Sequence, residues 1–226
     1  MELKSYLIEK KLSQIKNFPF ILLYGENRGL IDKFKLYGDT LIIDDASYDQ
    51  TPAIAKKNSK YYIRNIRNLG YDYSLRAGIS YICKNLKKKK YIITCDGDNQ
   101  HNPKYIKLFI YNIKNKKISL VIGSRNKFNR FSEKIVSLIS KFTIRINDPY
   151  SGMKAYKISR INKKIKKLKT LSDTIGLFGI LIFNRNEIKD INIIVKAKNK
   201  ISSYGDNFFI KINLLLNFLK ILFYFC

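Results

Sequence analysis

The sequence predicts an α/β fold, with a mostly parallel, Rossmann-like sheet flanked by helices. Short apolar runs rich in β-branched residues alternate along the chain with segments whose apolar residues recur at helical spacing. Several of the apolar runs end in acidic or small residues, as strands do where a sheet edge carries a site. The chain has 226 residues, 46% of them hydrophobic, which is enough for one domain with a sizeable core.

The predicted strands are short, buried runs. Each is bounded by glycine, proline or polar residues, and each is separated from the next by a helical or turn segment. In sequence order they are Phe18–Gly25, Asp39–Ser47, Tyr61–Ile66, Tyr91–Asp96 and Ile118–Arg125.

The predicted helices are recognised by their periodicity and by their first turns. Pro52 lies near the start of one helix and Pro103 begins another, since proline is tolerated in a first turn. The N-terminal stretch, residues 1–18, is charged and helical in pattern, without the apolar run of a signal peptide. The other predicted helices are Thr51–Lys60, Tyr73–Lys90, Pro103–Lys114, Phe131–Ile144 and Ile158–Lys169.

Two C-terminal segments allow more than one interpretation. Ile158–Lys169 has a thin apolar stripe among lysines, so it is either a surface helix on the core or a helix facing anionic lipid. We divide the chain into one α/β domain, residues 1–205, and a C-terminal amphipathic or membrane-associating helix, residues 206–226. Asn213, Asn217 and Lys220 share one face of that helix, which favours a helix lying in a membrane plane or packed on the domain over a membrane span.

Charge and cysteine content limit the partners and the compartment. The chain has 44 Lys and Arg against 17 Asp and Glu, a formal charge of +27, which favours anionic partners such as phosphorylated substrates or an anionic membrane surface. No nucleic-acid-binding motif is recognisable, so nucleic acid is not an expected partner. Its three cysteines form neither a metal motif nor a disulfide framework, which indicates a reducing, cytoplasmic setting.

Acidic residues follow two of the predicted strands. Asp44 and Asp45 end one strand, while Asp96 and Asp98 end another, and the carboxyl ends of parallel strands meet at one edge of a sheet. Two carboxylates separated by Gly97 could bind one hard cation, with a nearby glutamine as a neutral oxygen ligand. Taken alone, the same aspartates could equally form a polar turn that caps a helix.

Five segments in order carry a family resemblance: "IIDDASYDQT", "RNLGYDYSLRAGI", "CDGDNQHNP", "VIGSR" and "DPYSGMKAY". The chain resembles the family 2 glycosyltransferases of the GT-A fold, and most of all the branch of dolichyl- and polyprenyl-phosphate sugar synthases. The resemblance implies an inverting hexosyltransferase that uses Mg²⁺ or Mn²⁺. It further implies a UDP- or GDP-sugar donor, a lipid-phosphate or glycolipid acceptor, and a peripheral position on the cytoplasmic face of a membrane.

The resemblance also implies roles for particular residues. Asp96, Asp98 and Gln100 would bind the metal, and Asp96, Asp98, Arg125 and Asp148 form the expected catalytic set. The expected donor-binding residues are Tyr24, Glu26, Asp44, Asp45, Asn68, Gly70 and Arg76. Gly25 replaces the asparagine usual in the turn "LLYGEN", which makes recognition of the nucleobase less certain. His101 is expected to be structural.

On the acceptor side, the resemblance points to Arg125 and to the loop Asp148–Lys154. We expect Arg125, Arg130, Arg145 and Lys154 to hold the acceptor phosphate. A hydroxyl acceptor would instead require a general base, for which the sequence offers Asp173, Glu187 and Asp190 without a preference. Two other functions stay open: a soluble enzyme that elongates a surface polysaccharide, and an inactive relative that serves as a membrane-bound interaction module.

Overall fold

The structure is a computed structural model, and it describes residues 20–24, 34, 36–86, 88–97, 100–128, 130–170, 174, 176–196, 212, 215–219 and 222. Within this part of the chain a seven-stranded sheet has the order β3-β2-β1-β4-β6-β5-β7. All its neighbouring strands are parallel except at β6, which is antiparallel to both β4 and β5. The strands are β1 (Phe20–Tyr24), β2 (Asp39–Asp44), β3 (Tyr61–Arg64), β4 (Tyr91–Asp96), β5 (Leu120–Arg125), β6 (Lys154–Lys157) and β7 (Ile188–Ile193).

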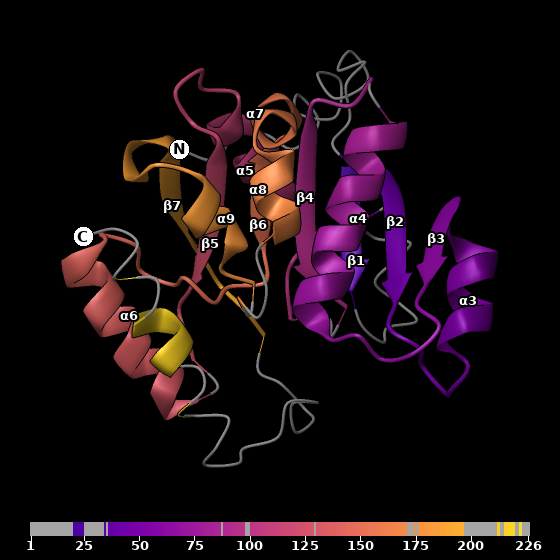
Figure 1. The fold of residues 1–226 in the computed structure, drawn as a ribbon, viewed down its shortest axis with the longest axis horizontal. Coiled ribbons are helices and arrows are strands. Elements are labelled where there is room, and N and C mark those ends of the chain that lie inside the picture. The colour runs from indigo at the N-terminus through magenta and orange to yellow at the C-terminus, as the bar shows by residue number, and fades with distance from the viewer. Residues whose placement is uncertain are drawn as a thin grey trace.

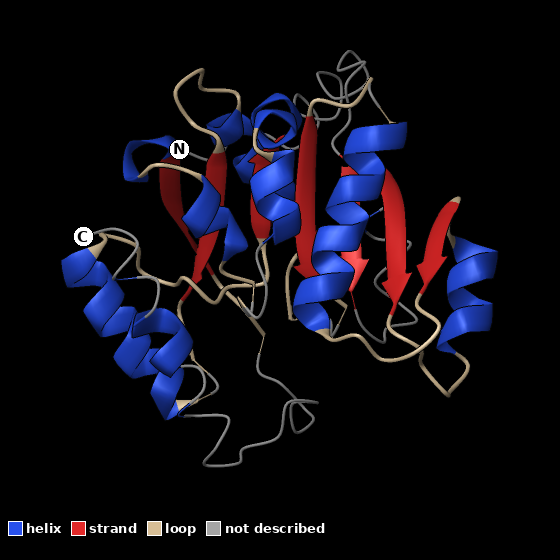
Figure 2. Cartoon of the chain, viewed as in Figure 1, coloured by secondary structure: helices blue, strands red, loops and turns tan. Residues whose placement is uncertain are grey.

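Helices cover both faces of this sheet, and Figure 2 shows them in blue around the red strands. They are α3 (Thr51–Asn58), α4 (Tyr71–Asn85), α5 (Tyr105–Ile113), α6 (Phe131–Thr143), α7 (Ile158–Lys163), α8 (Ile165–Thr170) and α9 (Phe178–Ile182), with a 3₁₀ turn at Arg185–Glu187. The alternation of side chains along the strands divides the core in two. Leu41 and Ile43 of β2 join the cluster that contains α4, whereas Ile42 joins the cluster that contains α5.

The predicted fold class is confirmed, and several boundaries and elements needed correction. The segment around Lys154–Lys157 was expected to be loop, but it forms β6, and β7 was not predicted at all. The single helix expected over Ile158–Lys169 is two short helices, interrupted at Lys164. Ile158 and Ile161 are buried in the core, which favours the interpretation of α7 as a surface helix on the domain.

Only part of the predicted termini can be compared with the structure. The N-terminal helix expected over residues 1–18 lies outside the described residues. Residues 215–219 are helical, and Phe218 is fully buried in the same hydrophobic cluster as Val136 of α6. Asn217, expected on a polar face, is also buried. No helix among the described residues is long and apolar enough to cross a membrane.

Candidate functional site

The predicted site residues meet at the carboxyl edge of the sheet, because β2, β4 and β5 all run toward that edge (Figure 1). Asp44, Asp96 and Arg125 are the last residues of these strands. Lys154 reaches the same edge from the other direction, since it is the first residue of the antiparallel β6. Tyr24 ends β1 and its Cα is in register with that of Asp96, which places its backbone at this edge as predicted.

Asp96 offers a partly exposed carboxylate. Its side chain is 34% exposed, and Oδ2 lies 3.4 Å from Nε2 of the buried His101. Burial raises the pKa of Asp96, but the hydrogen bond to His101 and the charges of His101, Arg125 and Lys154 outweigh it. The net result is a pKa below the ordinary value, so this carboxylate is ionised at neutral pH. His101 therefore orients Asp96, in agreement with its expected structural role.

Gly152 gives the Asp96 carboxylate its space. A Cβ atom at Gly152 would lie 2.1 Å from Oδ2 of Asp96, far inside van der Waals contact. The hydroxyl of Thr94 donates to the Gly152 carbonyl at 2.9 Å and accepts from the Lys154 backbone N–H at 3.2 Å, which holds the loop against β4. A residue with a side chain at position 152 would occupy the place where Asp96 now lies.

Arg125 is held in a buried network of charges. Its guanidinium donates to Asp148 at 2.7 and 3.1 Å, and its backbone N–H donates to the same carboxylate at 3.1 Å. Glu133 of α6 lies 3.3 Å from Arg125 and 3.2 Å from Arg130. Burial alone would lower the pKa of Arg125, but Asp148, Glu133 and Asp96 raise it above its ordinary value. The network joins the end of β5, the start of α6 and the predicted acceptor loop.

Lys154 lies inside the site rather than on its surface. The side chain is 1% exposed, and its ammonium donates to the carbonyls of Ser151 and Gly176. Burial lowers its pKa to about 8, although Asp148 and Asp96 partly oppose that shift. The expectation that Lys154 holds an acceptor phosphate directly is therefore wrong, because its ammonium is buried and already donates to two backbone carbonyls. It contributes instead a buried positive charge.

The two aspartates at the end of β2, Asp44 and Asp45, differ in surroundings, but both make hydrogen bonds within the protein. Asp44 has no exposed side-chain surface, accepts from the Tyr62 hydroxyl at 2.8 Å, and pairs with Arg64 at 3.3 Å. Asp45 accepts from the Asn65 amide and from two backbone N–H groups, at Leu69 and Gly70. Burial raises the pKa of Asp45, and these hydrogen bonds lower it further than burial raises it. Both side chains shape the turn that the sequence assigned to nucleoside binding.

The segment Asn68–Arg76 forms the start of α4 beside those aspartates. Gly70 has a φ of 84°, a left-handed conformation that strains any residue with a side chain. Asn68 accepts from the Gly70 N–H, and Arg76 pairs with Asp72 at 3.2 Å. Asp72 was not predicted as a site residue, yet it accepts from Thr174 and from the Gly176 N–H, residues about a hundred positions later in the chain. This long-range contact shows that Asp72 connects α4 to the site, which the sequence alone does not reveal.

The predicted metal ligands other than Asp96 are only partly covered by the structure. Asp98 lies outside the described residues, and so does Glu26, which was expected to bind the donor. Gln100 is buried, and its amide nitrogen donates to the Lys196 carbonyl at 3.3 Å. In the described part of the chain, no three His, Cys, Asp or Glu side chains are grouped so that they could hold a metal ion. The structure therefore leaves the predicted roles of Asp98 and Gln100 as predictions.

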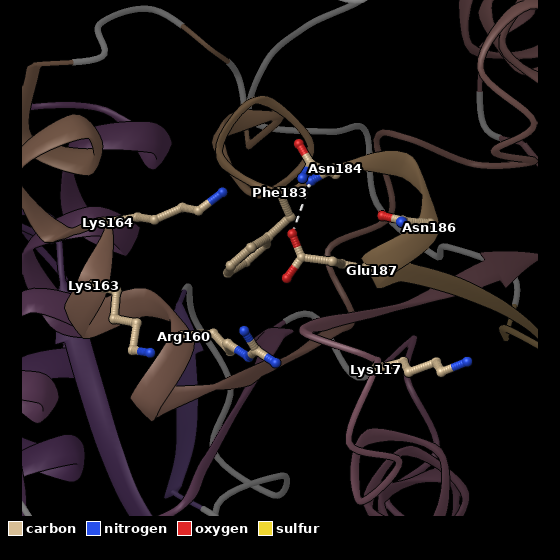
Figure 3. A pocket seen from close by; sticks show the side chains of 8 residues that line it. All are labelled: Lys117, Arg160, Lys163, Lys164, Phe183, Asn184, Asn186 and Glu187. Atoms are coloured by element: carbon tan, nitrogen blue, oxygen red, sulfur yellow. Dashed lines mark hydrogen bonds between the residues drawn. The ribbon is translucent and has the colours of Figure 1, made fainter.

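The candidate general bases are engaged or lie elsewhere. Asp190 accepts from the Asn147 backbone N–H at 2.7 Å, and Asp173 lies outside the described residues. Glu187 precedes β7, at the opposite edge of the sheet, where it accepts from Ser119 at 2.6 Å. It lies in a pocket of about 550 Å³ (Figure 3). That pocket is lined by Lys117, Arg160, Lys163, Lys164, Phe183, Asn184, Asn186 and Glu187.

The family of the chain follows from a match to Glycosyl transferase family 2 over residues 38–190. The chain belongs to glycosyl transferase family 2. The matched range includes β2, the edge residues from Asp44 to Lys154, and the first half of β7. The site residues described above are thus those of a glycosyltransferase domain.

Curated relatives are similar over part of their lengths. One uncharacterised protein of Methanocaldococcus jannaschii is 28% identical over 173 residues, which are 71% of this chain and 70% of the relative. A second uncharacterised protein of the same organism is 34% identical over 102 residues, 42% of this chain and 44% of that protein.

Solved structures share the fold at low sequence identity. Glucosyl-3-phosphoglycerate synthase from Mycobacterium tuberculosis, in complex with phosphoglyceric acid, matches with a TM-score of 0.66 and 15% identity. The match covers 97% of this chain and 85% of that one. A second structure of that enzyme, with Mn²⁺ and UDP-glucose, has the same TM-score and identity, and the match covers 97% and 84% of the two chains. These similarities support the GT-A fold.

Proposed function

We propose that this protein transfers a sugar, with inversion, from a nucleotide-diphosphate sugar to a lipid-phosphate acceptor, with Mg²⁺ or Mn²⁺ as cofactor. One observation carries the proposal. An ionised, partly exposed carboxylate, Asp96, ends β4 at the sheet edge where ligands bind in such folds, and the charges of Arg125 and Lys154 act on it. A family 2 glycosyltransferase domain surrounds it.

The residues present suit a hard divalent cation. Mg²⁺ and Mn²⁺ take oxygen ligands and are commonly held by one or two carboxylates together with substrate phosphates. The Asp96 carboxylate occupies space that the Cβ of any other residue at position 152 would fill, so Gly152 is needed for this position of the carboxylate. We assign the cation to Asp96 and Asp98, with Gln100 nearby. The bound cation would neutralise charge on the departing diphosphate.

The chain's own residues supply the rest of the electrostatic environment. Arg125 and Lys154 are buried cations whose orientation is fixed by hydrogen bonds to Asp148 and to backbone carbonyls. Such pre-organised charges stabilise a developing negative charge without reorganising during the reaction. Asp45 and Gly70 fix the turn that would border the nucleoside, with Asp45 accepting the Gly70 N–H at 2.7 Å.

A phosphate acceptor suits this site better than a hydroxyl acceptor. A lipid phosphate is ionised at neutral pH and needs no general base, whereas a hydroxyl does. Of the candidate bases in the described part of the chain, Glu187 lies at the opposite edge, and Asp190 uses one carboxylate oxygen to hold the Asn147 backbone N–H. Arg125, Arg130 and Arg145 remain the proposed phosphate-binding residues. An acceptor of this kind implies action at the cytoplasmic face of a membrane.

The proposal is tested by a donor screen scored as release of UDP or GDP with Mn²⁺ present. We expect at least one sugar nucleotide to be turned over by the wild type and by Asp39→Asn, a matched control at the opposite edge of the sheet. Asp96→Asn should lose about a hundredfold or more in rate. No turnover of any sugar nucleotide, or full activity in Asp96→Asn, would contradict the proposal.

The acceptor is tested separately, once a donor is known. Polyprenyl phosphate in detergent and 3-phosphoglycerate are compared as acceptors at equal concentrations. We expect radiolabelled sugar in the lipid fraction. If sugar is transferred to 3-phosphoglycerate and not to polyprenyl phosphate, the proposed lipid acceptor is wrong, although the protein is still a glycosyltransferase.

A further inference from the structure

The helix α6 exposes a stripe of large apolar side chains, while several of its buried residues are polar. Phe131, Ile135, Leu138 and Phe142 are 73, 37, 60 and 77% exposed. Their spacing of four, three and four residues places them on one side of the helix. The residues of α6 that face inward and are buried are Ser132, Glu133, Val136 and Ser140. An amphipathic helix on a globular domain normally buries its apolar side.

Polar contacts fix this orientation of α6. Glu133 pairs with Arg125 and Arg130, and two α6 serines donate to the loop that follows the helix: Ser137 to the Asn147 carbonyl and Ser140 to the Ile146 carbonyl. Rotating the helix to bury its phenylalanines would break the pair of Arg125 with Glu133 and leave the Asn147 and Ile146 carbonyls without these serine donors. The apolar side is therefore held outward by the same contacts that form the site.

The charges around the exposed side are positive. Lys134 and Lys141 are exposed on α6, and Arg145 is exposed just after it. Glu133 is the sole acid in the sequence of α6, and it is buried. An apolar stripe bordered by lysines, without exposed acids, is the composition of helices that lie on anionic lipid surfaces.

We propose that the exposed side of α6, formed by Phe131, Ile135, Leu138 and Phe142 with Lys134 and Lys141, docks on the surface of an anionic lipid bilayer. We call it the α6 face. The inference rests on the proposed lipid-phosphate acceptor and deepens it, because α6 begins next to the site. Glu133, in its first turn, contacts Arg125 at the end of β5. Docking would therefore bring the acceptor side of the site to the lipid.

A second stripe supports this assignment. Ile212, Leu216 and Leu219 are exposed at spacings of four and three residues. Leu215 and Phe218 turn instead to the hydrophobic cluster that contains Val136 of α6. A second copy of this chain suits the α6 face less well, since a two-fold contact would bring the lysines of the two copies together.

Vesicle binding tests the α6 face without any substrate. We compare sedimentation with vesicles of phosphatidylcholine alone and of phosphatidylcholine mixed with phosphatidylglycerol, in the absence of nucleotide and acceptor. The wild type should bind the anionic vesicles. Leu138→Ser/Phe142→Ser and Lys134→Gln/Lys141→Gln should each lose about tenfold or more in partitioning. The control Tyr111→Ser, on α5, should bind as the wild type does, since Tyr111 is as exposed as Phe142 at 77%.

Fluorescence gives an independent measurement, because the sequence contains no tryptophan. Phe142→Trp should shift its emission to shorter wavelength when anionic vesicles are added, and Tyr111→Trp should not. Equal binding by the wild type and both double variants, or no binding by the wild type, would overturn the proposal. Concentration-dependent dimerisation that Leu138→Ser/Phe142→Ser abolishes, without vesicle binding, would assign the face to a second copy. Sugar-nucleotide turnover without vesicles reports on the proposed function alone.

Discussion

Asp96 combines two properties that a metal ligand in this fold needs. Its carboxylate is partly exposed, and neighbouring cations keep it ionised. The sequence indicated Asp96 through its position after an apolar run, since strand ends are visible in the hydrophobic pattern. Gly152 could be recognised from the sequence only as one residue of the segment "DPYSGMKAY". Its close approach to Asp96 across 56 positions of sequence depends on the register between β4 and β6, which no local pattern reveals.

Gly152→Ala should weaken metal-dependent nucleotide binding by about tenfold or more, because the new Cβ would displace the Asp96 carboxylate. Calorimetric titration of UDP or GDP with Mn²⁺ measures the effect. Gly179→Ala is the matched control, since its Cβ would meet Tyr156 at 2.8 Å, away from Asp96. The control should lower the melting temperature and keep the affinity of the folded protein. If Gly152→Ala and Gly179→Ala bind the nucleotide with equal affinity, the space that Gly152 leaves for the Asp96 carboxylate does not matter for binding.

Lys154 gives the protein a pH dependence that can be measured. Its pKa is about 8 in the folded state against 10.5 in the unfolded state, so the unfolded chain binds more protons between these values. The free energy of unfolding should therefore rise with pH across this window. Relative to Lys154→Met, the wild type should gain about 2 kcal/mol between pH 8 and pH 10 in urea unfolding. A difference that is constant with pH would contradict the depressed pKa of Lys154.

At the scale of elements, β6 is one of two strands that sequence reasoning missed, the other being β7. The strand β6 has four residues, it begins with a lysine, and it runs antiparallel between two parallel strands, so it lacks the apolar run that identified the others. Asp148 and Gly152 precede it, and β6 carries them to the carboxyl edge of the sheet. The resemblance placed these residues on the acceptor side, and the antiparallel insertion explains how they reach Arg125 and Asp96.

The pair of Arg125 and Asp148 should be important for stability as well as position. Asp148→Asn removes one partner of a buried ion pair and leaves the Arg125 guanidinium beside a neutral amide. We expect a loss of about 3 kcal/mol in the free energy of unfolding, measured in urea. Asp39→Asn, which removes the partially exposed pair with Lys89, should cost about 1 kcal/mol or less. Similar losses in the two variants would contradict the structural role of Asp148.

At the scale of the whole molecule, the alternating pattern was sufficient to predict the parallel sheet and the edge that carries the site. The strands β2, β4 and β5 and the helices between them follow from local periodicity. The orientation of α6 does not, because its hydrophobic pattern predicts that the phenylalanines face inward, whereas the buried Glu133 and serines turn them outward. Tertiary polar contacts decide which side of that helix is exposed.

The central claim is that Asp96 binds a divalent cation that carries a nucleotide diphosphate, and calorimetric titration tests it most directly. UDP and GDP are each titrated with and without Mn²⁺ into the wild type, Asp96→Asn and Asp39→Asn. We predict binding of at least one nucleotide that requires Mn²⁺, that is retained by Asp39→Asn, and that weakens by about a hundredfold in Asp96→Asn. Absence of Mn²⁺-dependent binding of either nucleotide to the wild type, or unchanged binding to Asp96→Asn, would contradict it.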